Sequence, residues 1–199
     1  MHNIFTCPIF NQQGFTGNGF LVDNFFLTAG HIIEQNISNG YYYMVNGKTC
    51  QFHNALFYEY HNNENINSER MDLTIFQQNQ IHSPLKFYKV IPQPNTPISI
   101  QGFHLSQNEK IEPFISNGEI HRSHGYQSIS TYKTIQQNNI FEIRNANLME
   151  PGISGSPVFY NNNICGMVIA HYSNLLIALS SSYILTQLSI LRSRKHIES

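Results

Sequence analysis

Residues 152–157 of the chain read Gly-Ile-Ser-Gly-Ser-Pro and run directly into the apolar segment Val158-Phe159-Tyr160. A serine between two glycines, just before a strand-like segment, indicates a tight turn that presents a hydroxyl group. That hydroxyl is a weak nucleophile until an imidazole removes its proton, and a buried carboxylate must hold the imidazole in place. If Ser154 is a nucleophile, a suitable histidine and a suitable acid must occur elsewhere in the chain.

Both partners occur upstream of this turn. Residues 25–31 read Phe-Phe-Leu-Thr-Ala-Gly-His, an apolar strand ending in small residues that let His31 turn into a cleft. Asp72 opens a second apolar strand, and the only other aspartate, Asp23, occupies a turn position. The order His, Asp, Ser differs from the orders found in subtilisin and in α/β-hydrolases. The sequence therefore predicts His31, Asp72 and Ser154 as a catalytic triad.

Composition excludes several other classes of function. The net charge is −1 without a basic face, so we expect no nucleic-acid partner. No segment approaches the ~18 apolar residues of a membrane-spanning helix, so we expect no membrane partner either. The ten histidines include no HxxxH or HxH pair that would indicate a metal site. We therefore expect no metal and no other cofactor.

The cysteines and the N-terminus bear on the compartment. Three widely spaced cysteines make a poor disulfide framework. The first residues lack the basic region and long apolar run of a signal peptide. Together these features predict a cytoplasmic protein.

Most segments are short, β-branched or aromatic, and separated by Gly, Asn or Pro. Two hairpins are expected, at 20–27 and at 41–53, the second with an Asn-Gly turn. Proline-rich residues 91–97 resemble a linker. The fold class predicted is all-β, with one barrel in 1–90 carrying His31 and Asp72, and a second in 98–199 carrying Ser154. A terminal helix over about 182–194, capped by Ser181 or Ser182, should close the chain.

Three segments resemble the chymotrypsin-like (trypsin-like) serine peptidases. Residues 27–31 are similar to the Leu-Thr-Ala-Ala/Gly-His element of that family, and Asp72-Leu73 to its Asp-Ile/Leu element. Residues 150–157 and 178–184 look most like bacterial high-temperature-requirement proteases and glutamyl endopeptidases. The resemblance implies two packed antiparallel six-stranded β-barrels with the triad between them. It also implies that the backbone N–H groups of Gly152 and Ser154 form the oxyanion hole.

One departure from the family concerns activation. Digestive relatives carry an aspartate before the nucleophile, which pairs with a freed N-terminus. Ile153 stands there and cannot make that pair. The chain should therefore be active without cleavage of a propeptide.

A second departure concerns the specificity pocket. Alignment from Ser154 puts Leu148 at its base and Val168, Ile169, Ala170 and His171 along its wall. The base carries no acid, so cleavage after Lys or Arg is disfavoured. His171 stands where relatives have Gly. It makes the pocket shallow and selective for small residues, or donates to Gln or Glu, or turns to solvent.

These features favour a serine endopeptidase of narrow specificity that acts on a protein or peptide. One version cuts after the terminal Gly of a small ubiquitin-like protein. Two alternatives stay open: a non-catalytic peptide-binding module on the same fold, and an esterase using the same triad.

Overall fold

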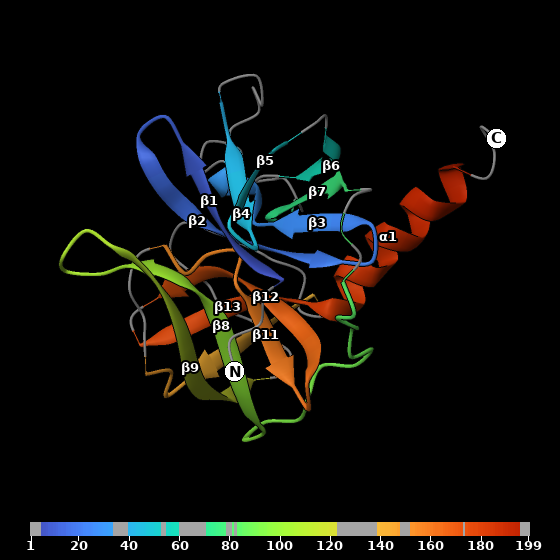
Figure 1. Ribbon diagram of the computed structural model, residues 1–199. Coiled ribbons are helices and arrows are strands. Elements are labelled where there is room, and N and C mark those ends of the chain that lie inside the picture. The colour runs from blue at the N-terminus through green and yellow to red at the C-terminus, as the bar shows by residue number, and fades with distance from the viewer. Residues whose placement is uncertain are drawn as a thin grey trace, which may run out of the picture.

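The computed structural model describes residues 5–33, 40–52, 55–59, 71–78, 81, 83–122, 139–147, 152–172 and 174–195. The elements found there are almost all β-strands, followed by one α-helix, as Figure 1 shows. In chain order they are β1 (Thr6–Asn11), β2 (Gly14–Val22), β3 (Phe25–Thr28), the 3₁₀ turn η1 (Gly30–Ile32), β4 (Tyr42–Val45), β5 (Lys48–Gln51), β6 (Ala55–Glu59), β7 (Leu73–Gln77), β8 (Pro97–Leu105), β9 (Ile111–Arg122), β10 (Ile140–Arg144), β11 (Pro157–Tyr160), β12 (Asn163–Tyr172), β13 (Leu175–Ser180) and α1 (Ser181–Lys195).

The strands form two antiparallel sheets. Strands β1 to β7 make one sheet in the order β5-β4-β1-β2-β3-β7-β6, and strands β8 to β13 close into a six-stranded barrel in the order β10-β13-β12-β11-β8-β9. The all-β prediction with a C-terminal helix is confirmed. The first sheet differs from the expected six-stranded barrel. It has seven strands, and no pairing between described residues joins β5 at one edge to β6 at the other.

Local turn chemistry accounts for the two predicted hairpins. Asp23, between β2 and β3, has a φ of 50°. Asn46 and Gly47, between β4 and β5, have φ values of 50° and 73°, as a two-residue turn of this kind requires. Both hairpins are therefore confirmed.

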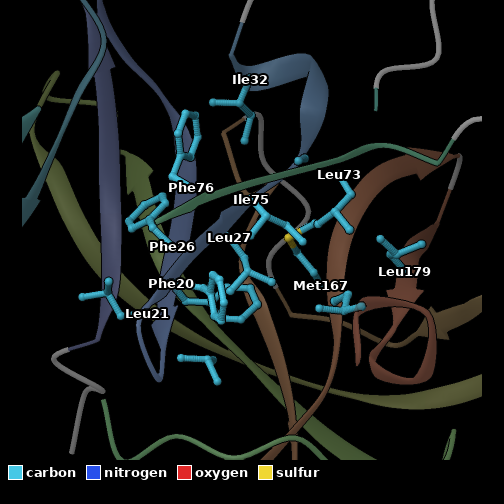
Figure 2. Packing of buried hydrophobic residues seen from close by; sticks show 14 of the residues in the cluster. Phe20, Leu21, Phe26, Leu27, Ile32, Leu73, Ile75, Phe76, Met167 and Leu179 are labelled. Atoms are coloured by element: carbon cyan, nitrogen blue, oxygen red, sulfur yellow. The ribbon is translucent and has the colours of Figure 1, made fainter. Parts of the chain in front are cut away.

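The two sheets share one hydrophobic core. Figure 2 shows Met167 and Leu179, from strands β12 and β13 of the barrel, in the same cluster as Leu27, Leu73 and Ile75 from the first sheet. All five side chains have no exposed surface. Burial of this kind contributes about 1.5–3 kcal/mol for each large aliphatic side chain. The shared core fixes the two sheets relative to one another.

Helix α1 begins one residue earlier than expected and has a different cap. The N–H of Tyr183 donates to the hydroxyl of Ser180, at 3.4 Å, so Ser180 rather than Ser181 or Ser182 is the capping residue. The helix leaves the barrel and runs past the first sheet (Figure 1), where Arg192 forms an ion pair with Asp23 at 2.6 Å. The division of the chain into 1–90, 91–97 and 98–199 stays a prediction, although the first strand of the barrel begins at Pro97.

Candidate active site

The register of β3 and β7 brings His31 and Asp72 to the same end of the first sheet. The two strands pair antiparallel, with Thr28 opposite Thr74. The chain leaves β3 after Thr28 and carries His31 in the 3₁₀ turn, while Asp72 lies immediately before β7. Because one strand ends where the other begins, the two side chains meet.

Their apolar neighbours in sequence anchor them. Ile32, which follows His31, and Leu73, which follows Asp72, are 4% and 0% exposed. Figure 2 shows both side chains within the packed cluster. The backbone of each polar residue is therefore held by a buried neighbour, as a preorganised site requires.

Asp72 binds His31 through both carboxylate oxygens. Oδ1 accepts a hydrogen bond from the backbone N–H of His31 at 2.8 Å, and Oδ2 lies 2.5 Å from Nδ1 of the ring. With Nδ1 bonded to a carboxylate, a neutral ring carries its proton on Nδ1 and leaves the Nε2 lone pair available as a base.

Gly30 allows this close approach. A Cβ on Gly30 would lie 2.2 Å from the carbonyl oxygen of Glu59 and 3.0 Å from Oδ1 of Asp72. Any larger residue would push the end of β6 or the carboxylate away. The small residue before the histidine is therefore a steric requirement of the site.

The surroundings of His31 change its titration. Burial acts to lower the pKa of His31, but the hydrogen bond and negative charge of Asp72 outweigh it, so the pKa is raised above the ordinary 6.5. The side chain is 34% exposed and that of Asp72 is 14% exposed. The ring is thus accessible from solvent while its orienting carboxylate is shielded.

Ser154 lies in a sharp turn that packs against the segment carrying His31. Gly152 and Gly155 on either side have φ values of +93° and +80°. The N–H of Gly155 donates to the carbonyl of Val168 at 2.8 Å. A Cβ on Gly155 would lie 3.0 Å from Cδ1 of Ile32, so the turn touches the residue next to His31. The structure thus brings all three predicted triad residues into one region.

The two predicted oxyanion donors belong to this turn. Among hydrogen bonds between described residues, the N–H groups of Gly152 and Ser154 donate to no protein acceptor. Gly152 and Ser154 are both partly exposed, whereas Ile153 between them is 3% exposed and packed in the barrel core.

The predicted pocket residues fall into two groups. Leu148 lies outside the described residues. Val168 and Ile169 are 0% and 7% exposed and belong to the hydrophobic core, so Val168 does not line an open pocket in this structure. Ala170 is half-buried and His171 is exposed. Of the residues expected in the wall, Ala170 and His171 are therefore the two whose side chains solvent can reach.

Strand β12 also offers backbone groups beside the turn. Up to Met167 it pairs with β11 and β13, but over 170–172 the described residues pair it with β13 alone. Among the described residues, the second edge of this stretch has no strand partner, and such an edge can pair with another extended chain.

Solved structures match this fold over nearly the whole chain. Mouse neuropsin, a serine protease, superimposes with a TM-score of 0.71 at 15% identity, covering 93% of this chain and 92% of that chain. The chain has the chymotrypsin-like fold. The Rv3671c protease from M. tuberculosis, in its active form, shares this fold with a TM-score of 0.67 at 16% identity, over 92% of this chain and 79% of that one.

The chymotrypsin-like fold also occurs in a protein named as inactivated. A scabies mite inactivated protease paralogue, S-D1, superimposes with a TM-score of 0.75 at 13% identity, covering 96% of this chain and 92% of that chain. No protein-family profile and no curated protein matches the sequence. Likeness at these identities establishes the fold, and activity must be argued from the residues of this chain.

One residue near the site was not anticipated from sequence. Asn18, on β2, has no exposed surface and bonds to the turn that carries Ser154. Its neighbours Gly17 and Gly19 give it the composition of a turn. No local sequence pattern therefore pointed to Asn18.

Proposed function

We propose that the protein is a serine endopeptidase with His31, Asp72 and Ser154 as its triad. The observation that carries this proposal is the two-oxygen contact of Asp72 with His31 beside the glycine-flanked Ser154. In the proposed reaction, Ser154 Oγ attacks the peptide carbonyl and His31 Nε2 accepts its proton. His31 then protonates the leaving amine as the C–N bond breaks. Water, deprotonated by His31, hydrolyses the acyl-enzyme and restores the serine.

The N–H groups of Gly152 and Ser154 would stabilise the oxyanion. Both belong to the same turn, and neither is used by a protein acceptor among the described residues. Donors that are fixed before the reaction need no rearrangement as negative charge develops. The positive φ of Gly152 gives this donor a direction that other residues rarely adopt.

An extended peptide is the substrate that best suits the open edge of β12. Pairing with 170–172 would place the peptide alongside the turn that carries Ser154. An ester without a peptide backbone gains nothing from such an edge. This favours an endopeptidase over an esterase.

We further propose that the enzyme has narrow specificity, acts in the cytoplasm, and cuts after a small residue such as the terminal Gly of a ubiquitin-like protein. Support comes from His171, an exposed and bulky residue on the expected wall of the pocket. The three cysteines are free thiols, which suits a reducing compartment. Among the described residues, no helix is long and apolar enough to cross a membrane.

Cleavage of a peptide library tests both the activity and this preference, using the chain without prior proteolytic treatment. We expect peptides with Gly or Ala before the scissile bond to be cut faster than those with Phe, Arg or Glu. His171→Gly should reduce the ratio of the cleavage rate of Gly or Ala peptides to that of peptides with larger residues by about ten- to two-hundredfold, the scale of small steric contacts in a pocket. The preference of His171→Ala should be intermediate between that of the native chain and that of His171→Gly.

Two other outcomes separate the alternatives for His171. If its ring donates to substrate, the native enzyme prefers Gln or Glu and His171→Gly loses that preference. If the ring only meets solvent, the variant has the native profile. A native preference for Phe or Arg contradicts the proposed pocket, and no cleavage of any peptide favours the binding module.

The rate should depend on pH through His31. Only the neutral ring accepts the serine proton, so kcat/KM should rise with pH through the pKa of His31 and level off above it. Because Asp72 raises that pKa, the inflection should lie above 6.5. Asp72→Asn removes both raising effects, so the inflection of its residual activity should move to lower pH. An inflection that stays in place would mean that another group controls the titration.

A further inference from the structure

Asn18 connects three parts of the molecule through hydrogen bonds. Its side-chain Nδ2 donates to the carbonyl of Gly152 at 2.7 Å and to that of Phe103 at 2.9 Å. Its Oδ1 accepts from the N–H of Phe103 at 2.7 Å. The residue belongs to β2, Phe103 belongs to β8, and Gly152 precedes the candidate nucleophile.

The bonding partners settle which side-chain atom is nitrogen. The N–H of Phe103 can only donate, so the atom facing it must be the oxygen of the amide. The carbonyls of Gly152 and Phe103 can only accept, so the atom facing them must be the NH₂ group. Both amide protons of this fully buried side chain are therefore used.

The backbone of Asn18 holds the other side of the same turn. Its N–H donates to the carbonyl of Ser154 at 2.9 Å, and its own carbonyl accepts from the hydroxyl of Thr28 at 2.7 Å. A Cβ on Gly155 would lie 1.8 Å from that carbonyl, so Gly155 packs directly on Asn18. Asn18 thus donates hydrogen bonds to the carbonyls of Gly152 and Ser154, the residues on either side of Ile153.

The backbone of Gly152 needs hydrogen bonds from other residues to fix its conformation. It has a φ of +93° and no side chain, so little in its own structure fixes its peptide planes. A Cβ there would lie 2.6 Å from Cε1 of Phe15, which excludes a larger and stiffer residue. The bonds from Asn18 fix the peptide plane after Gly152 and the plane after Ser154. The plane between them, which carries the Ser154 N–H, is therefore held from both sides, and the Gly152 N–H is restrained through the adjoining plane.

We infer that Asn18 is a positioning residue for the oxyanion hole, acting by holding the carbonyls of Gly152 and Ser154. It does not touch the reacting atoms. The inference rests on the proposed endopeptidase function. Its first consequence, the order of the turn, holds whether or not the protein is a protease.

Asn18→Asp and Asn18→Ala test the inference. Aspartate keeps the size and the acceptor for Phe103 but loses both donated bonds, while alanine removes all three side-chain bonds. Ile120→Val is the control, because it trims a fully buried side chain of a residue whose backbone bonds to Asn95 and Thr96 and not to the turn. All rates are normalised to the folded fraction from near-ultraviolet circular dichroism.

The first readout needs no catalysis. The backbone N–H of Gly155 donates to Val168 of β12, and that of Ser156 donates to Ile153 within the turn. Hydrogen exchange of these two amides should be at least about tenfold faster in both Asn18 variants than in Ile120→Val. Exchange elsewhere in the barrel should match that control. Equal exchange in the turn overturns the inference, even if the native protein proves to be no protease.

The second readout is kinetic. Losing one oxyanion donor lowers kcat about 10²- to 10³-fold, so a donor left loosely held should lower kcat by about ten- to a hundredfold. KM should change by less than about twofold, because the oxyanion forms only in the transition state. In Asn18→Ala the pH inflection should stay at its native position, since the bond between His31 and Asp72 is intact.

Each remaining outcome is decisive. Native kcat in both variants contradicts the inference, and so does a rise in KM with kcat unchanged. If one of the two Asn18 variants does not fold, Asn18→Ser is used in its place, because its hydroxyl group can still donate a hydrogen bond from a shorter side chain. If all three fail to fold while Ile120→Val folds, Asn18 serves the fold as a whole and the inference is wrong. If the native chain shows no proteolysis but the turn amides exchange faster in the Asn18 variants, the proposed function is wrong and the role of Asn18 in ordering the turn stands.

Discussion

Ser154→Ala should lower the turnover of a peptide substrate by about 10⁶-fold, the scale on which removal of the serine acts in a well-studied serine protease. The reason is that the other hydroxyl of the turn, that of Ser156, is fully buried and cannot reach a substrate to form the acyl-enzyme. The backbone N–H donors remain, so substrate affinity should change little. The measurement is the initial rate of hydrolysis of a peptide that the native chain cuts.

The same turn provides the matched control. Ser156 is fully buried, and its hydroxyl has no hydrogen-bond partner among the described residues. Ser156→Ala makes the same chemical change two positions away and removes an unsatisfied polar group, which is close to neutral for stability. It should keep the native rate. Equal loss in the two variants would show that the turn is sensitive to any change and that Ser154 has no special role.

Asp72→Asn should lower kcat by about 10³- to 10⁴-fold without unfolding the chain, by analogy with the same change in a well-studied triad. An amide in place of Oδ2 favours the tautomer with its proton on Nε2, so His31 loses its lone pair toward Ser154. The positive ring that forms during the reaction also loses its counter-charge. The rate and the melting temperature should be measured together.

Asp23→Asn is the control for this change. Asp23 is the only other aspartate, and it forms an exposed ion pair with Arg192 far along the chain. Exposed pairs contribute about 0–1 kcal/mol, so both activity and stability should be close to native. A loss under tenfold in Asp72→Asn would mean that another acid orients His31.

Sequence patterns predicted the elements whose signals are local. The hairpin at Asn46-Gly47 follows from turn chemistry, and the end of β3 at Thr28 follows from the small residues after it. The contact of His31 with Asp72 was predicted from the chemistry that the two residues would share. Pairing register, which brings them together, depends on strands far apart in sequence.

Two strands were missed because their local signals are weak. Strand β1 contains Pro8, which argues against a central strand, yet it pairs with β2 along its length and with β4 only at Ile9 and Phe10. Strand β6 is five residues long and has a register shift between Ala55 and Phe57. In both, pairing with neighbours outweighs the local preference.

The role of Asn18 was beyond any local pattern. Its partners Phe103 and Gly152 lie 85 and 134 positions away in sequence. A single sequence gives no sign that these groups meet, and the two flanking glycines point to a turn. Only the packing of the first sheet on the barrel creates the bonds.

Labelling with a fluorophosphonate probe tests the central claim most directly, because it reports an activated serine without any assumption about substrate. The native chain, untreated by any protease, should gain one probe by intact mass, and peptide mapping should place it on Ser154. Asp72→Asn should react far more slowly, and Ser154→Ala should gain no probe. Equal labelling of Ser154→Ala, or no labelling of the folded native chain, would contradict the assignment of Ser154 as the nucleophile.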